Sequence, residues 1–406
     1  MKNLWLPAFC ALALAAGCSS ASTSSSAGDD GGVEAPAGSN LQTVSFQMKQ
    51  TVSAGEEVFK CQLVTLPNVN AWMVHGEHDY TPGSHHMLLF TTDFTSIPAG
   101  EDQVQDCYEG TDSAVMSHIR GLIYGGQTPT GSEQFPPGVG LVTSPNQILL
   151  FQVHYLNSTA AALDAEVNVK LTLDSGTDVT TNAGVLFFYD PFIDVPAGAK
   201  AKASMRCMIP RDITLLSAQS HYHARGVGYS AFLDADATHL APSPFYTSAS
   251  WSSPALMTMN TAVKGGSHIR FGCDYDNSTG TQEFFQGPSA ATNEMCMFIG
   301  TYYPDLGALD DFCEAGPDYF GTGSTTCGDT LSCVSACGTP SLTSDCMQKC
   351  VVQSCPLAAT ALVPLLKCEQ SSCSSQCKNT AGSECTTCLK TSCASAYTGC
   401  TSQACQ

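Results

Sequence analysis

Cysteine is the residue type that most constrains how this chain can fold. The 406-residue sequence contains 22 cysteines, and 14 of them lie between Cys327 and Cys405. A short cysteine-dense segment is typical of an exported module held by disulfides, because disulfides persist in oxidising compartments. The sequence before Gly321 carries far fewer cysteines over a much greater length. We therefore expect a separate cysteine-rich module over residues 321–406.

The cysteines of this module are spaced in a near repeat. Cys333 and Cys337 are echoed 40 residues later by Cys373 and Cys377, and further cysteines follow in both copies. A repeat of this length predicts a supersecondary unit, here a helical hairpin, in which cysteines at i and i+4 share one helix face. A thiolate metal site on the Cys-x2-Cys pair of the second copy is the competing interpretation. Disulfides are favoured in an exported chain, so we interpret the module as a stapled interaction or spacer unit without catalytic residues.

The N-terminus predicts export. Lys2 precedes an apolar run over residues 4–16, which is too short to span a membrane as a permanent helix. Small residues then precede Cys18, as in the lipobox of bacterial lipoproteins. We expect residues 1–17 to be a lipoprotein signal peptide, Cys18 to be lipidated and residues 18–42 to form a flexible Ser/Ala/Gly tether, with ordinary signal cleavage nearby as the alternative. The predicted location is the cell envelope, at the bacterial outer membrane or cell surface, where the lipid anchor holds the protein on the membrane.

Between the tether and the module the sequence is typical of β-structure. Over the whole chain 43% of residues are hydrophobic and only 13% are charged, with 35 glycines and 21 prolines. Gly and Pro around short Val-, Leu- and Phe-rich runs, without a long helical pattern, predict a mainly β fold with two antiparallel β-sandwiches. A turn-forming segment at residues 196–199 marks the joint, and we expect one sandwich over residues 43–192 and another over 193–320. The net charge of -20 should repel nucleic acid, which we exclude as a partner.

Histidines are concentrated in the strand-like segments. Of ten histidines, five lie in three apolar stretches, where unpaired polar rings are costly. His221 and His223 have alternate positions in one stretch, so a β-strand would place both imidazoles on one face as a chelate for copper or zinc. The other five lack a partner at ligand spacing and are expected to be ordinary core or surface residues: His75, His78, His118, His239 and His268. Of these, His78 lies beside Asp79 in a polar stretch and is expected at the surface.

The remaining candidate ligands are weaker by themselves. His85 and His86 are neighbours, and neighbouring strand residues face opposite ways, so a shared metal requires a local twist or different ring nitrogens. His154 lies in a second apolar stretch of the first sandwich. Met295 offers a thioether, although a lone methionine is normally core filler. The candidates therefore divide into two groups, one in each sandwich.

Taken together and in order, these segments resemble the copper type II, ascorbate-dependent monooxygenases. The family includes peptidylglycine α-hydroxylating monooxygenase and dopamine β-monooxygenase, and the resemblance extends from about Val44 to Cys313, here in a bacterial lipoprotein form. It also includes Asp106–Thr111 and the turn at residues 137–140. The segments that carry it are His85-His86-Met87-Leu88-Leu89-Phe90, Gln152-Val153-His154-Tyr155, His221-Tyr222-His223 and Glu294-Met295-Cys296.

The resemblance implies two jelly-roll sandwiches that face a solvent-filled cleft and hold two copper ions. One copper would be bound by His85, His86 and His154 and would pass electrons. The other would be bound by His221, His223 and Met295, the catalytic set, whose thioether favours Cu(I), the state that meets O2. The enzyme would hydroxylate an aliphatic C–H of a small-molecule or peptide-like substrate, with ascorbate or a similar reductant as co-substrate.

The resemblance also implies a pairing for the six cysteines of the sandwiches. Sequence alone leaves fifteen connectivities open. The implied disulfides are Cys61–Cys107, Cys207–Cys313 and Cys273–Cys296.

The sequence departs from the peptide-amidating members of the family. Their arginine two residues before the His-X-His pair is Gln219 here, and Met297 and Ile299 replace the Asn and Tyr that assist it. Apolar side chains cannot supply those hydrogen bonds, so peptidylglycine is disfavoured as a substrate. Arg225 is expected to be structural rather than an anion contact. No lyase domain follows, so two-step amidation is not encoded.

Two other functions compete with a monooxygenase. A cell-surface copper-binding or interaction protein could keep the ligands without turnover, and metal content would not separate it from the enzyme. A zinc hydrolase is disfavoured, because a thioether is a poor zinc ligand and hydrolytic zinc needs a general base nearby. Oligomeric state is not predicted by any feature of the sequence.

Overall fold

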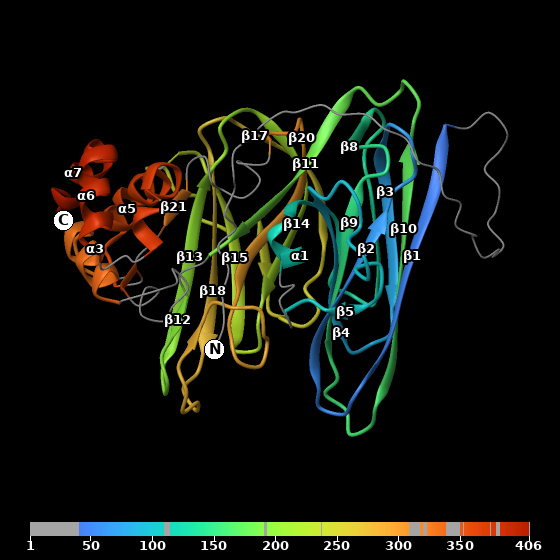
Figure 1. Ribbon diagram of the computed structural model, residues 1–406, viewed down its shortest axis with the longest axis horizontal. Coiled ribbons are helices and arrows are strands. Elements are labelled where there is room, and N and C mark those ends of the chain that lie inside the picture. The colour runs from blue at the N-terminus through green and yellow to red at the C-terminus, as the bar shows by residue number, and fades with distance from the viewer. Residues whose placement is uncertain are drawn as a thin grey trace.

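The computed structural model describes residues 40–108, 114–190, 193–236, 238–307, 317–319, 323–337, 350–351, 353–373, 375–378 and 382–405. These residues form a mainly β protein with a small helical, disulfide-rich C-terminal region, as expected from the sequence. Figure 1 shows the helical module at one end, the second sandwich in the middle and the first sandwich at the other end. The predicted signal peptide and Cys18 lie outside the described residues, and the last residues of the predicted tether already belong to strand β1.

The first sandwich packs two sheets around one core. Alternation on β10 shows how the sequence builds it, since Ala165, Val167, Val169 and the two following alternate residues are buried while their neighbours are not. One layer contains β1 (Leu41–Val52), β10 (Leu163–Asp174), β3 (Ala71–Tyr80) and β8 (Val139–Thr143), with β7 (Thr130–Gln134) paired to β3. The other layer contains β5 (Gln105–Asp106), β2 (Glu57–Thr65), β9 (Ile148–Leu156), β4 (Ser84–Thr92) and β6 (Ile119–Gly126), with the short helix α1 (Ala114–Ser117) between β5 and β6 in the chain.

The second sandwich repeats this arrangement with its own core. One layer contains β11 (Thr181–Tyr189), β20 (Cys296–Tyr303), β14 (Ile213–Tyr222) and β17 (Met257–Val263). The other contains β16 (Tyr246–Ser248), β15 (Gly226–Asp234), β18 (His268–Asp276), β13 (Lys200–Met208) and β21 (Pro317–Tyr319). A two-stranded sheet is formed by β12 (Asp194–Val195) and β19 (Phe284–Phe285).

The two sandwiches share a sheet. Strand β11 pairs in parallel with β8 over Thr181–Ala183 and then antiparallel with β20 from Gly184 onward, so the sheet continues from one sandwich into the other. The start of β11 packs in the first core and Leu186 and Phe188 pack in the second. The join is therefore a strand common to both units, and it lies before the boundary that the sequence placed after residue 192.

The C-terminal module packs short helices around cystine sulfurs. Its helices are α3 (Cys327–Ala336), α5 (Pro356–Cys368), the π-helix η1 (Glu369–Cys373), the 3-10 helix η2 (Gln376–Lys378), α6 (Ser383–Ser392) and α7 (Ala394–Thr401). The disulfides between described residues are Cys327–Cys400, Cys333–Cys350, Cys355–Cys405, Cys368–Cys393, Cys373–Cys388 and Cys377–Cys385. In the second copy of the repeat, both cysteines of the Cys-x2-Cys pair are oxidised, so they are not thiolate metal ligands.

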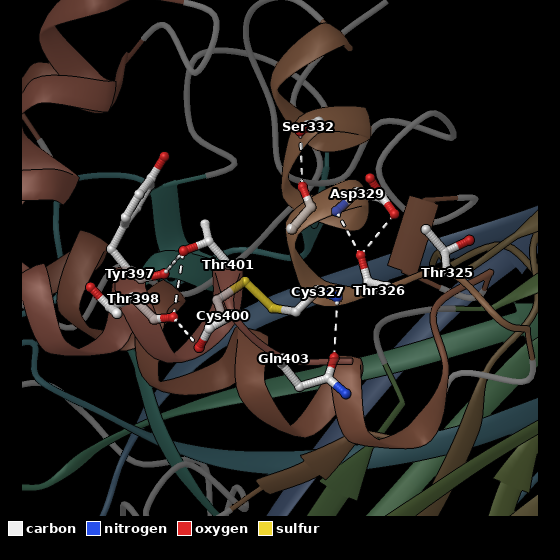
Figure 2. The surroundings of a disulfide bond; sticks show 12 residues. Thr325, Thr326, Cys327, Asp329, Ser332, Tyr397, Thr398, Cys400, Thr401 and Gln403 are labelled. Atoms are coloured by element: carbon white, nitrogen blue, oxygen red, sulfur yellow. Dashed lines mark hydrogen bonds between the residues drawn. A yellow bond between two sulfur atoms is a disulfide. The ribbon is translucent and has the colours of Figure 1, made fainter. Parts of the chain in front are cut away.

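Figure 2 shows how the first and last helices of this module are joined. The Cys327–Cys400 disulfide bridges a sequence separation of 73 residues. Thr326 caps α3, where its side chain accepts a hydrogen bond from the Asp329 backbone N–H. The Gln403 side chain accepts from the Cys327 backbone N–H at 3.2 Å, which satisfies a second free donor of that helix end. None of the helices among the described residues is long and apolar enough to span a membrane.

Candidate metal centre

The first group of histidines lies on two adjacent strands of the first sandwich. His86 on β4 is directly opposite His154 on β9, and the register shifts between Ser84 and His86, so His85 is the extra residue of a β-bulge. A bulge re-aims side chains, and it supplies the local twist that two neighbouring histidines need to face one site. The three ring centroids form a nearly equilateral triangle, with distances of 5.2 Å between His85 and His86 and 5.1 Å from each to His154.

Glu57 fixes the orientation of the third ring. The Glu57 carboxylate accepts a hydrogen bond of 2.8 Å from His154 Nε2, and Phe59 stacks on the same ring at a centroid distance of 3.9 Å. With Nε2 as the donor, Nδ1 of His154 carries the lone pair, and this buried atom has no hydrogen-bond partner among the described residues. Burial opposes ionisation of Glu57, but hydrogen bonds from His154 and Ser289 outweigh it and lower the pKa of the carboxyl to about 2.

In the second group, His221 is the opposite tautomer to His154, with the proton on Nδ1. His221 lies on β14, and its Nδ1 is 2.7 Å from Gln127 Oε1, while Gln127 Nε2 donates to the Ser220 carbonyl. The amide orientation makes Oε1 the acceptor, so His221 Nδ1 is protonated and Nε2 carries the lone pair. His223 Nδ1 donates to the Asn293 carbonyl at 3.3 Å, and its buried Nε2 has no hydrogen-bond partner among the described residues.

Met295 is anchored next to these rings. It precedes Cys296, whose disulfide with Cys273 ties the start of β20 to β18, and the Tyr275 hydroxyl donates to the Met295 carbonyl at 2.7 Å. Met295 lines the same cavity as His86 and His221. The structure thus contains Cys61–Cys107 and Cys273–Cys296, two of the pairs that the resemblance implies. Cys207 is disulfide-bonded, and Cys313, its expected partner, lies outside the described residues.

Glu294, the acidic residue directly before Met295, has a structural role. Glu294 accepts hydrogen bonds from the backbone and Nε of Arg225 and from the His223 backbone N–H, which fixes the turn after β14 against the segment that carries Met295. Burial raises the pKa of Glu294 to about 7, although Arg225 opposes this shift. Arg225 therefore serves the scaffold, as the sequence suggested.

The two groups form a single cluster. His86 and His221 have ring centroids 4.9 Å apart, His85 and His221 are 5.3 Å apart, and the ligand atoms of these three histidines all lie within 4.8 Å of one another. Among the described residues, the two groups are therefore in contact, where the resemblance implied that a solvent-filled cleft would separate them. The shared sheet and three side chains of the first sandwich hold the sandwiches together: Glu57 bonds to Ser289 and Ala290, Gln127 to His221 and Ser220, and Glu133 to Thr301.

Burial keeps the cluster uncharged. All five histidines are buried, with at most 6% of any side chain exposed. Burial, and then repulsion from neighbouring imidazolium groups, lowers the pKa of His85, His86, His221 and His223 well below the usual value of 6.5. Neutral imidazole is the form that binds metals. Because His85, His86, His154 and His223 each bury a ring nitrogen without a hydrogen-bond partner among the described residues, the cluster has the chemistry of a metal site.

The other histidines lie elsewhere, and one expectation was wrong. His78 is only 8% exposed, bonds through its ring to the Tyr124 hydroxyl and the Thr128 carbonyl, and packs against Gly126, where a Cβ would clash with it. Strand β3 turns this residue toward the interior, so the polar neighbour Asp79 was a misleading signal.

Replacing both Cys273 and Cys296 with alanine is expected to lower the free energy of unfolding by about 3 kcal/mol, because the bond closes a loop of 23 residues. The melting temperature of the β region should fall by roughly 6–12 °C in thermal unfolding followed by circular dichroism. An unchanged melting temperature would contradict the bond as a stabilising staple. The variant keeps Cys61–Cys107 as an internal reference for the first sandwich.

Comparison with known proteins does not assign this chain to a family. No family model matches the chain, and no curated protein matches it. Among solved structures, PNGF-II aligns with a TM-score of 0.28 and 10% identity over 65% of this chain and 64% of that one, less than two thirds of its length. The major capsid protein P2 from bacteriophage PM2 aligns with a TM-score of 0.23 and 10% identity over 66% of this chain and 99% of that one. Likenesses this weak carry no argument about function.

Proposed function

We propose that this protein is a copper-dependent monooxygenase that hydroxylates an aliphatic C–H with O2 and an ascorbate-like reductant. The observation that supports it most is the buried cluster of five neutral imidazoles with a thioether on the wall of the adjoining cavity. Copper bound there would supply one-electron redox chemistry and the reduction of O2. The overall change is that R–H, O2, two electrons and two protons become R–OH and water, with both electrons from the reductant.

The residues present offer ligands for two copper ions, and the three histidines whose ligand atoms lie within 4.8 Å of one another, His85, His86 and His221, come from both proposed sets. In the proposal His85, His86 and His154 hold one ion, and His221, His223 and Met295 hold the other. The hydrogen bonds assign the donor atoms, since Glu57 leaves Nδ1 of His154 available and Gln127 leaves Nε2 of His221 available. The thioether of Met295 is a soft ligand that suits Cu(I) better than zinc, which disfavours hydrolysis.

The role of the chain is to bind the metal, to orient the substrate and to exclude water from the site. The buried rings and the Phe59 stack keep bulk solvent from the ligands, and the cavity beside Met295 would place a substrate next to the catalytic set. Excluding water from the ligands would also limit side reactions with solvent.

A turnover assay tests the proposal. Copper-loaded protein with ascorbate should consume O2 faster when a substrate is added, and hydroxylated product should appear in equal amount. Electron paramagnetic resonance of the oxidised protein should show type II copper. Copper binding without any substrate-dependent consumption would instead indicate the non-catalytic copper-binding protein.

A Glu57→Gln variant is expected to bind copper at the first set about 10–100-fold more weakly, because the charged acceptor behind His154 is lost. Titration against a competing cuprous chelator measures this affinity. Glu166→Gln is the matched control, since Glu166 pairs with Lys49 on the surface, away from the histidines. Equal affinities in the two variants would rule out the supporting role of Glu57.

We also propose that the protein is a lipoprotein of the cell envelope. The many disulfides agree with an exported protein, and Cys18 is the predicted anchor. A Cys18→Ala variant should move from the membrane fraction to the soluble exported fraction, as followed by immunoblotting. Retention on the membrane would argue against lipidation at this residue.

A further inference from the structure

The cavity beside the histidine cluster has a defined size. Its volume is about 200 Å³, and it lies between the sandwiches, with His86 from the first and His221 and Met295 from the second on its wall. An apolar cavity of roughly 150 Å³ is known to hold one benzene molecule. The space therefore suits a substituted benzene or a branched aliphatic molecule of similar size.

The rest of the wall is mainly apolar. Side chains from both sandwiches contribute to it, so a ligand would be enclosed by surfaces that meet only when the sandwiches are together. The apolar residues that matter here are Leu88, Phe90, Ile119, Phe187, Met297 and Ile299. Burial of an apolar ligand against them would be favourable, because apolar surface would be removed from water.

The charges of the wall discriminate against anions. No lysine or arginine is among the described residues that line it, whereas the acidic residue Asp190 is. Gln127, one of its polar residues, uses its oxygen on His221 and its NH2 group on Ser220. Gln219 does not line the cavity, and its side chain donates to the Pro254 carbonyl at 2.8 Å. A carboxylate would thus be buried without a counter-charge, which is costly.

We propose that this cavity binds a largely apolar small molecule without an anionic group, of about the size of a substituted benzene. The inference names the substrate class for the function proposed above and rests on it in that respect. Affinity comes from apolar burial and shape, because the wall offers a ligand carboxylate no cation.

Two probes of nearly equal size test the charge preference: benzyl alcohol and benzoate. The full-length protein is used without copper, so that no metal ion can pair with the carboxylate, and binding is measured by ligand-observed nuclear magnetic resonance. Benzyl alcohol is expected to bind at least tenfold more tightly than benzoate. Benzoate binding as tightly as benzyl alcohol, or no binding of benzyl alcohol, would overturn the proposal.

A charge introduced into the wall should reverse the selectivity. Ile299→Lys is expected to weaken the binding of benzyl alcohol and to strengthen the binding of benzoate by at least tenfold. Val142→Lys, at an exposed position, should change neither affinity. If Ile299→Lys does not fold, the ranking of the two probes on the unmodified chain decides alone. Because binding is measured without turnover, the two proposals can fail separately. Benzyl alcohol binding without any substrate-dependent O2 consumption would refute the proposed monooxygenase activity and leave the proposed ligand class standing. Turnover of an anionic substrate would support the monooxygenase activity and refute the ligand class.

Discussion

A Met295→Ile variant is expected to lose at least 100-fold in substrate-dependent O2 consumption while the fold is retained. Isoleucine has a similar volume and no sulfur, so the substitution removes the ligand atom and preserves the apolar wall. The loss should exceed the 10–100-fold typical of a partner behind a ligand, because Met295 is proposed to bind the copper itself. The rate with excess ascorbate and a screened substrate is the measurement.

A second methionine provides the control. Met205→Ile changes a buried residue in the core of the same sandwich, away from the cavity. Met205→Ile should lower the free energy of unfolding about as much as Met295→Ile does, and it should retain turnover. Copper at His85, His86 and His154 should remain in both variants, as counted by metal analysis. Turnover that survives in Met295→Ile would show that the thioether is not part of the catalytic set.

The mainly β fold could be predicted because local patterns determine it. From Ala165 to Leu173, every second residue of strand β10 is buried and the residues between are not, and the cysteine-rich module is visible in the spacing of its cysteines alone. The join between the sandwiches could not be predicted. The two ends of β11 pair with strands of different sandwiches. These pairings, such as Thr181 with Val139 and Gly184 with Tyr302, join residues that are distant in sequence.

The candidate site was visible through its histidines and not through their partners. His221 and His223 are recognisable at a spacing of two because a strand alternates. Glu57 lies 97 residues from His154, and Gln127 lies 94 residues from His221, so only tertiary packing brings them together. Both are single polar residues without a motif. The merging of the two groups into one cluster likewise depends on how the sandwiches meet, which no local pattern encodes.

Acidification is expected to destabilise the metal-free protein strongly. The pKa values of His85, His86, His221 and His223 are lowered in the folded state, first by burial, whereas the unfolded chain titrates near 6.5. Stability is therefore complete above pH 6.5 and is lost as the pH falls toward the lowered values, because the unfolded state takes up the protons. Over pH 7.5 to 5.5 the four rings together should lower the free energy of unfolding by up to about 5 kcal/mol, and Glu294, whose pKa is raised to about 7, should offset about 2 kcal/mol of this loss.

That loss is large beside the 5–15 kcal/mol of a typical domain. Urea unfolding of chelator-treated protein at several pH values measures it. A His85→Gln variant should reduce the dependence by about a quarter, and His239→Gln, at a surface site with 76% of its side chain exposed, should leave it unchanged. A flat profile down to pH 5.5 would mean that the rings are hydrated in solution. The sandwiches would then stand apart, because burial of this cluster requires both of them.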